Sequence, residues 1–548
     1  MLLSFAPAVI AALLLLLLPG IIWAWWRYPA PERSTRLAVG FAVGFAFQVH
    51  TCALLAWGPG ITQSTVLLAT SFGITVAAVL VCCTRLRRPL PAGMSRRHSR
   101  QLVGLLGVVA LPRLAPLILE QIPSGWDPSF HSLLASTTLA SHRLPAWSPF
   151  EQIPSNYPYG SHVFIAQISL VTGIAPDSVF AVLINGVLPT CTCLALYALA
   201  RRVLRSYAYA LSAVAAYGLL GNWGSIQYPL WGGLPNELGL FMLLVFLVVL
   251  FAPAYDRTRI LVGGLILGAI PLSHHHVMLT TVMLLSVYVT YLAVRWFRSP
   301  GRPALRRQLM HAFIRLSLMS VLAVVTVSYY VIPLALRAGS LGSTRVAQFL
   351  DDLAGLPFEK NGLLLWVLTG IGGAVLIGAF QENRWSHAKL RARFAAAGTA
   401  GLARAFVVCA SATLLVAFVL CYYVYRFYSY NFTSAGQPFT LFTPTRFLTD
   451  LTYFLAFFAA IPLARLWHWS ISHLPRVNLS PATVRVMSRA SMRVAISIVV
   501  INTGITLLDV PAIQRNGHLR VGEADAFAWI RTHTPGNTLV VNLNPSAR

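Results

Sequence analysis

Long apolar runs separated by short polar segments recur along almost the whole chain. A helix of about 20 apolar residues is long enough to cross the hydrocarbon core of a bilayer. Runs of this length and composition therefore predict about fourteen membrane-spanning helices. The predicted spans cover residues 5–25, 36–57, 62–83, 101–118, 178–200, 207–220, 238–254, 258–273, 277–297, 312–334, 361–381, 404–425, 447–468 and 493–510.

The first apolar run sets the expected orientation of the chain. No positive residue precedes it, and Arg27, Arg33 and Arg36 follow it, which favours an uncleaved span with its N-terminus outside. With this orientation the arginine-rich loops all face the cytoplasm, as positive-inside topology requires. Of the fifteen acidic residues, only Glu32, Asp256 and Glu382 then face inward. We expect a multi-pass plasma (inner) membrane protein with both termini extracytoplasmic.

Composition supports this picture and excludes other classes. The chain is 57% hydrophobic and only 10% charged, whereas roughly a quarter of residues are charged in soluble proteins. Its net charge of +26 lies in short loops between apolar runs. This distribution indicates topology and contact with membrane lipids, and it does not indicate a nucleic-acid partner. The predicted fold is all-α and polytopic.

The expected domain organisation is a transmembrane domain at 1–510 and a short outer tail at 511–548, which we interpret as a possible truncated soluble domain. The transmembrane domain includes a long outer loop at 119–177, predicted to contain re-entrant or amphipathic structure. This loop concentrates carboxylates, histidines, aromatic residues and prolines in an otherwise apolar chain.

Within the outer loop, GWDPSFH places Asp127 before Pro128 and an amphipathic run. One interpretation makes Asp127 the N-cap of a helix that lies on the membrane surface. The same position would hold the carboxylate at the water–lipid boundary, where it can serve as a base. His131 lies one turn later, so the pair is also a candidate for a divalent metal site or a shared proton.

Two further carboxylates in this loop have two interpretations each. Glu120 is expected at the outer end of a span, and Glu151 follows the apolar AWSPF. Either is an interfacial charge or a second carboxylate of a site that removes a proton or steadies a leaving phosphate.

Other candidate residues lie in later outer segments. LSHHHVM places His274, His275 and His276 at an outer helix end, where a histidine can donate to a phosphate or form a polar turn. Successive helical residues point about 100° apart, so the three cannot all bind one ion. FTPTRFLTD places Arg446 at the head of a late span, on the side where arginines are scarce, and Arg426 lies in the preceding loop.

Glu237 follows Pro235 and Asn236 at the start of another span. Helix capping is a sufficient explanation for it on sequence grounds.

Together, GWDPSFH, the SHHH turn, TPTRFL and ADAFAWIRTHTPGNTLVVN resemble the polytopic GT-C-type glycosyltransferases that use polyprenyl-phosphate sugars. The resemblance extends thinly over most of the chain. It implies that Asp127 is the base or a metal ligand, with Arg446 and a histidine of the turn against the donor phosphate. The chain departs from the family pattern because three predicted spans precede the one that leads into the acidic loop, and because Asp127 has no adjacent acid.

The resemblance implies an inverting hexosyl- or pentosyltransferase that moves a sugar from a polyprenyl-phosphate donor to an envelope glycan, lipid or protein acceptor on the outer face. The alternatives are a polytopic transporter or lipid flippase, and an assembly subunit without catalysis. A transporter would more naturally carry ionisable residues or broken helices in mid-membrane.

Overall fold

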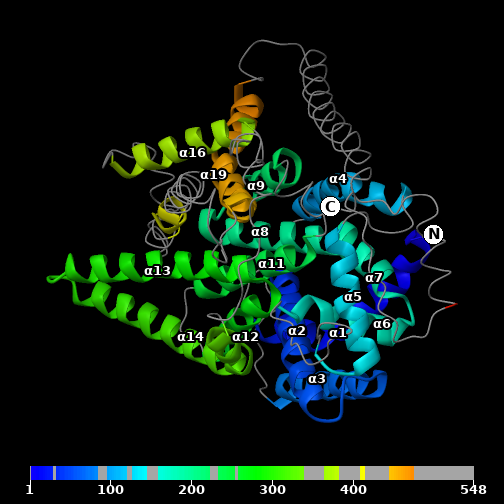
Figure 1. Ribbon diagram of the computed structural model, residues 1–548. Coiled ribbons are helices and arrows are strands. Elements are labelled where there is room, and N and C mark those ends of the chain that lie inside the picture. Colours follow the sequence, from blue (N-terminus) through cyan, green and yellow to red (C-terminus); the bar gives the residue numbers. More distant parts are fainter. Residues whose placement is uncertain are drawn as a thin grey trace, which may run out of the picture.

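The computed structural model describes residues 2–28, 32–83, 96–119, 126–144, 158–221, 233–252, 257–337, 363–381, 406, 408–413, 444–473 and 533. These residues are helical or lie in short connections, and none is in a strand. Six of the described helical stretches are long and apolar enough to cross a membrane, and shorter apolar helices accompany them. In the part that the structure describes, the chain is an all-helical, multi-pass membrane protein (Figure 1). The expected total of about fourteen spans stays a prediction.

The N-terminal helices are α1 (Leu2–Arg27), α2 (Arg33–Trp57) and α3 (Gln63–Cys83). α1 and α2 cross where Gly20 meets Gly44, so closely that a Cβ on Gly20 would overlap the Gly44 backbone. A Cβ on Gly44 would lie 2.6 Å from the Leu17 carbonyl oxygen. Small residues at such a crossing let two backbones approach, which is how helices commonly pack within membranes.

The next helices are α4 (Arg96–Leu119), α5 (Trp126–Ser141), α6 (Gly160–Thr172) and α7 (Pro176–Val182). α7 continues through a π-helical turn, η1 (Leu183–Val187), into α8 (Leu188–Leu204). The predicted outer loop thus contains two helices in its described part. α5 is a helix where the amphipathic run was predicted, and its position on the membrane surface stays a prediction, whereas α6 was not expected. α6 is apolar and largely buried, so this part of the segment folds into the helical body.

The helix α11 (Leu234–Leu250) lies in the middle of the bundle, and every one of its residues is buried. A helix that is apolar all round is stable in such a position. Its last carbonyl groups still need partners. Arg202 Nε donates to the Phe251 oxygen over 3.2 Å, and Arg315 Nη1 donates to the Ala252 oxygen over 2.8 Å. These two arginines satisfy the C-terminal end of a buried helix.

Before α11 come α9 (Tyr207–Ala215) and a second π-helical turn, η2 (Ala216–Leu220). After it, α12 (Arg257–Ser273), α13 (His275–Phe297) and α14 (Pro303–Arg337) follow, with α14 packed along α12. α13 and α14 form a hairpin that projects from the body of the molecule (Figure 1).

In the C-terminal half the structure describes α16 (Leu363–Gln381) and α19 (Pro444–His473), which pack against each other. α19 also packs against α9. Of the span predicted at 404–425, only residues 406 and 408–413 are described, and they are helical. The span predicted at 493–510 and the tail at 511–548, apart from residue 533, lie outside the described residues.

Contacts between the segments that join the helices agree with the predicted assignment of these segments to the two sides of the membrane. On the predicted inner side, Arg201 forms a 2.6 Å ion pair with Glu32. Burial raises the pKa of the Glu32 carboxyl, and the charge of Arg201 opposes that shift. On the predicted outer side, the Ile61 amide donates to the His142 carbonyl over 2.8 Å. Segments assigned to one side from their charge therefore meet one another in the fold, although which side is the cytoplasm stays a prediction.

Candidate functional site

Two histidines from the predicted outer loop meet inside the helical body. His131 on α5 and His162 on α6 are 3% and 0% exposed, and His131 Nδ1 lies 2.9 Å from His162 Nε2. One of these nitrogens donates the proton and the other accepts it. The His131 ring also stacks on Phe180 of α7, with centroids 5.9 Å apart. Both imidazoles are thus held in fixed orientations.

The backbone of α6 and two side-chain contacts connect this pair to the histidine turn. Tyr159 lies one turn before His162, and its ring meets Tyr330 of α14 edge-on at 5.5 Å. The Tyr330 hydroxyl lies 3.1 Å from His275 Nε2. The outer-loop histidines and the histidine turn, more than 100 positions apart in the sequence, therefore belong to one cluster. We call His131, Tyr159, His162, His275 and Tyr330 the outer cluster.

Close backbone packing holds the two parts of the outer cluster together. Gly160 begins α6 against the end of α12, and a Cβ there would lie 2.7 Å from the Leu272 carbonyl oxygen. Real Cβ atoms essentially never come that close. A glycine is therefore required at the point where the outer segment meets the residues leading into the histidine turn.

As helical geometry predicts, the histidine turn does not direct its three side chains to one point. His274 caps α13 in an extended conformation, and its ring stacks with that of His276 at 5.7 Å. His275 instead faces Tyr330. Within the described part of the chain, no group of three or more His, Cys, Asp or Glu residues is placed to hold a metal ion. Because the Asp127 side chain lies outside that part, the metal hypothesis for Asp127 and His131 stays untested.

The backbone of α5 puts Asp127 one turn before His131. The helix begins at Trp126, two residues earlier than the capping interpretation of Asp127 requires, because an N-cap at Asp127 would make Pro128 the first helical residue. Helix ends are defined only to within a residue or two, so this difference leaves the position of Asp127 at the head of the helix intact. The candidates Glu120, Glu151 and Arg426 lie outside the described residues.

Arg446 lies in the first turn of α19, and only its backbone is described. One turn later, Asp450 is fully buried and its Oδ2 accepts from the Thr280 hydroxyl of α13 over 2.8 Å. Thr280 in turn lies one turn after His276. Arg446 therefore lies one turn from a residue that hydrogen-bonds α13 one turn from the histidine turn.

A second polar cluster was missed by sequence reasoning. Glu237 on α11 is 1% exposed, and the Tyr217 hydroxyl donates to its two carboxylate oxygens over 3.2 and 3.3 Å. Thr192 of α8 lies beside the carboxylate, and Arg113 of α4 lies close enough to act on it electrostatically. We call these four residues the Glu237 cluster. The capping explanation of Glu237 is thus insufficient, because its partners come from three other elements.

The π-helical turn η2 shapes this second cluster. It contains Tyr217, and the Gly218 carbonyl in the same turn accepts from Arg113 at 3.4 Å. Arg113 is 1% exposed. Such turns are often found at functional sites. The one signal in the sequence was a carboxylate at the head of an otherwise apolar run.

The chain is similar to known proteins in structure and not in sequence. No family model matches the chain, and no curated protein is significantly similar in sequence. Solved structures of an archaeal oligosaccharyltransferase are similar to this chain in structure. The apo crystal structure of the Archaeoglobus fulgidus oligosaccharyltransferase is 15% identical with a TM-score of 0.46, covering 80% of this chain and 58% of that one.

The same archaeal enzyme tethered to an acceptor peptide is 16% identical, with a TM-score of 0.46. Its complex with an inhibitory peptide and a dolichol-phosphate is 16% identical with a TM-score of 0.43, covering 81% of this chain and 59% of that one. This chain therefore spans less than two thirds of the archaeal protein's length. A likeness at this level does not define an activity.

Proposed function

We propose that the protein is a membrane glycosyltransferase that moves a sugar from a polyprenyl-phosphate donor to an acceptor on the outer face of the plasma membrane. The observation that carries the proposal is the outer cluster. His131 contacts His162, and Tyr159, three residues before His162, contacts Tyr330, whose hydroxyl lies 3.1 Å from His275 Nε2. This cluster joins two of the four stretches in which the sequence resembles GT-C-type glycosyltransferases. The Thr280–Asp450 hydrogen bond brings the third stretch, around Arg446, to the same end of α13.

In this proposal Asp127 takes the proton from the acceptor hydroxyl. The acceptor oxygen attacks the anomeric carbon as the bond from that carbon to the phosphate oxygen breaks. Polyprenyl phosphate leaves from the opposite face, so the anomeric configuration is inverted. The guanidinium of Arg446 holds the departing phosphate with two parallel hydrogen bonds, and His274 or His275 donates a third.

The histidine pair has a positioning role. His131 lies one turn from Asp127, and its hydrogen bond to His162 fixes the ring. When His162 Nε2 carries the shared proton, His131 Nδ1 accepts it, and the proton on His131 Nε2 can be donated to the Asp127 carboxylate. A divalent metal ion bound by Asp127 and His131 would be an addition to this mechanism. Loss of sugar transfer on EDTA treatment would reveal it.

The test is transfer of labelled sugar from polyprenyl-phosphate hexoses and pentoses to the envelope fraction of membranes that contain the protein. We expect Asp127→Asn to lower the rate of transfer by about 10²–10⁴-fold, the usual contribution of a general base. Arg446→Gln should chiefly weaken binding of the donor. The matched control is Asp177→Asn, which removes an outer carboxylate whose Oδ1 accepts from its neighbour, the Ser178 amide. Full transfer by Asp127→Asn would defeat the proposal.

One observation favours a rival from another class. The Glu237 cluster buries a carboxylate and an arginine inside the helical body, and ionisable groups in such places often line transport pathways. A transporter or flippase would move its substrate without forming a covalent product. Movement of the polyprenyl-phosphate sugar across the membrane that Glu237→Gln abolishes, with no labelled glycan formed, would favour that rival. An assembly subunit without catalysis would neither transfer labelled sugar nor move the polyprenyl-phosphate sugar across the membrane.

A further inference from the structure

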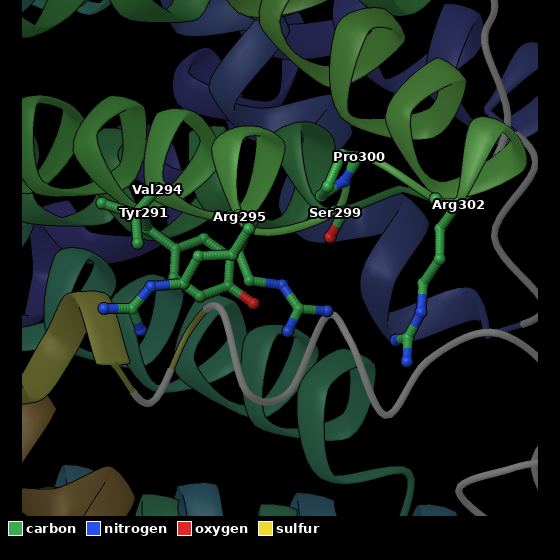
Figure 2. Close-up of a pocket in the computed structure, with 8 residues that line it drawn as sticks. Tyr291, Val294, Arg295, Ser299, Pro300 and Arg302 are labelled. Atoms are coloured by element: carbon green, nitrogen blue, oxygen red, sulfur yellow. The ribbon is translucent and has the colours of Figure 1, made fainter.

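The tip of the α13–α14 hairpin holds a pocket of about 440 Å³. Its lining includes Tyr291 and three arginines, Arg295, Arg298 and Arg302, and none of the lining residues is acidic. Figure 2 shows Arg295 and Arg302 extending to the same side of the turn that joins the two helices. The pocket therefore concentrates three guanidinium groups around one space. We call it the arginine pocket.

The surrounding sequence offers these arginines no counter-charge. From residue 257 to residue 350, which includes all of α12, α13 and α14, there is no Asp or Glu. Three cations around one space repel one another unless an anion lies between them. α14 also begins beside the pocket, and its first amide groups add positive potential there. The electrostatics favour an anion that comes from outside the hairpin.

The position of the pocket relative to the bilayer favours a phosphate at the membrane surface as its ligand. The 23 residues of α13 rise about 35 Å, close to the roughly 30 Å of a hydrocarbon core. Since His275 begins α13 at the predicted outer boundary, its other end reaches the opposite boundary. Phe297 is 78% exposed there, and Arg306 lies 4.4 Å above the Trp296 ring. Exposed aromatic residues beside arginines are typical of the level of lipid headgroups.

We propose that the arginine pocket binds the phosphate of an anionic lipid headgroup on the predicted cytoplasmic side. The guanidinium groups of Arg295, Arg298 and Arg302 hold the phosphate oxygens, and Tyr291 and Val294 pack beside the glycerol. Arginine suits this role because its planar fork matches two phosphate oxygens at once. The site lies at the opposite end of α13 from the outer cluster, so it is separate from the proposed transfer site.

The test titrates the purified full chain in detergent with phosphatidylglycerol and with phosphatidylcholine, and counts bound lipids by native mass spectrometry. The pocket variant combines Arg295→Gln, Arg298→Gln and Arg302→Gln. The control variant combines Arg33→Gln, Arg257→Gln and Arg307→Gln, which removes three exposed arginines of the same predicted side that do not line the pocket. If the pocket variant does not fold, Arg298→Gln alone against Arg307→Gln makes the same comparison.

We expect affinity for phosphatidylglycerol to fall at least about tenfold in the pocket variant, because it loses charge-assisted contacts to the phosphate, and less than twofold in the control. Phosphatidylcholine should bind more weakly than phosphatidylglycerol to the unmodified chain. Millimolar inorganic phosphate should leave the lipid bound. Displacement of the lipid by inorganic phosphate would instead assign the pocket to a free phosphate and overturn the lipid assignment. An equal loss in both variants would assign the arginines to general charge attraction and overturn the proposal.

Discussion

At the scale of single residues, the Glu237 cluster is the most demanding arrangement in the described structure. A buried carboxylate is costly unless hydrogen bonds and opposite charge compensate it. Glu237 obtains a donor from Tyr217, and Arg113 supplies the opposite charge. The cluster joins α4, α8, η2 and α11, so its loss affects the packing of four elements at once.

We expect Tyr217→Phe to lower the free energy of unfolding by about 1–3 kcal/mol, because the buried Glu237 carboxylate loses a donor. Tyr288→Phe is a matched control, since it removes a tyrosine hydroxyl from another buried ring. The measurement is thermal unfolding of the purified protein in detergent. Equal unfolding temperatures for Tyr217→Phe and the unmodified chain would show that the hydroxyl does not support the carboxylate.

The residues of the outer cluster show how much of the candidate site could be predicted from the sequence. His131 and His275 were selected because ionisable side chains in an apolar chain stand out. Their partners, His162 and Tyr330, were not assigned to a site, because a histidine in an apolar helix and a tyrosine near a helix end have ordinary interpretations. Only the folded chain brings them within hydrogen-bonding distance. The same holds for Tyr217, whose link to Glu237 crosses between elements.

At the scale of elements, the crossing of α1 and α2 depends on glycine. We expect Gly20→Ala to lower the unfolding temperature of the protein in detergent, because the added methyl group would overlap the Gly44 backbone and push the two helices apart. Gly104→Ala on α4 is the control, since no atom lies within 4 Å of its added Cβ. There the change should be neutral or stabilising by about 0.5–1 kcal/mol. Equal effects at both positions would contradict the close crossing.

Apolar length predicted the helices well, because a span must satisfy its backbone hydrogen bonds internally. The predicted spans at 5–25, 62–83 and 207–220 coincide closely with described helices. Two features did not follow from apolar length. The 13-residue helix α6 is shorter than a span, and the π-helical turns η1 and η2 leave no mark in hydropathy. Prolines and aromatic residues near 150–160 also concealed α6 within an apparent loop.

At the scale of the whole molecule, the arrangement of arginines predicts which turns face the cytoplasm. Gly58 lies in the exposed turn between α2 and α3. We expect the thiol introduced by Gly58→Cys to react with a membrane-impermeant maleimide on intact cells. A cysteine at Gly301→Cys, at the exposed hairpin tip, should react only after permeabilisation. The exposed native residues Cys82 and Cys83 are first replaced by alanine. The reverse labelling pattern would invert the predicted topology and place the arginine pocket outside.

The hydrogen bond from Thr280 to Asp450 joins positions 170 residues apart. A ribosome adds about 5–20 residues per second, so roughly 10–30 s separate the synthesis of the two partners. During that interval the histidine turn has already entered the membrane without the helix that carries Arg446. Newly made protein therefore passes through a stage in which the N-terminal helices are assembled and the proposed donor-phosphate contacts are incomplete. In the proposed mechanism, sugar transfer begins only after α19 has been inserted.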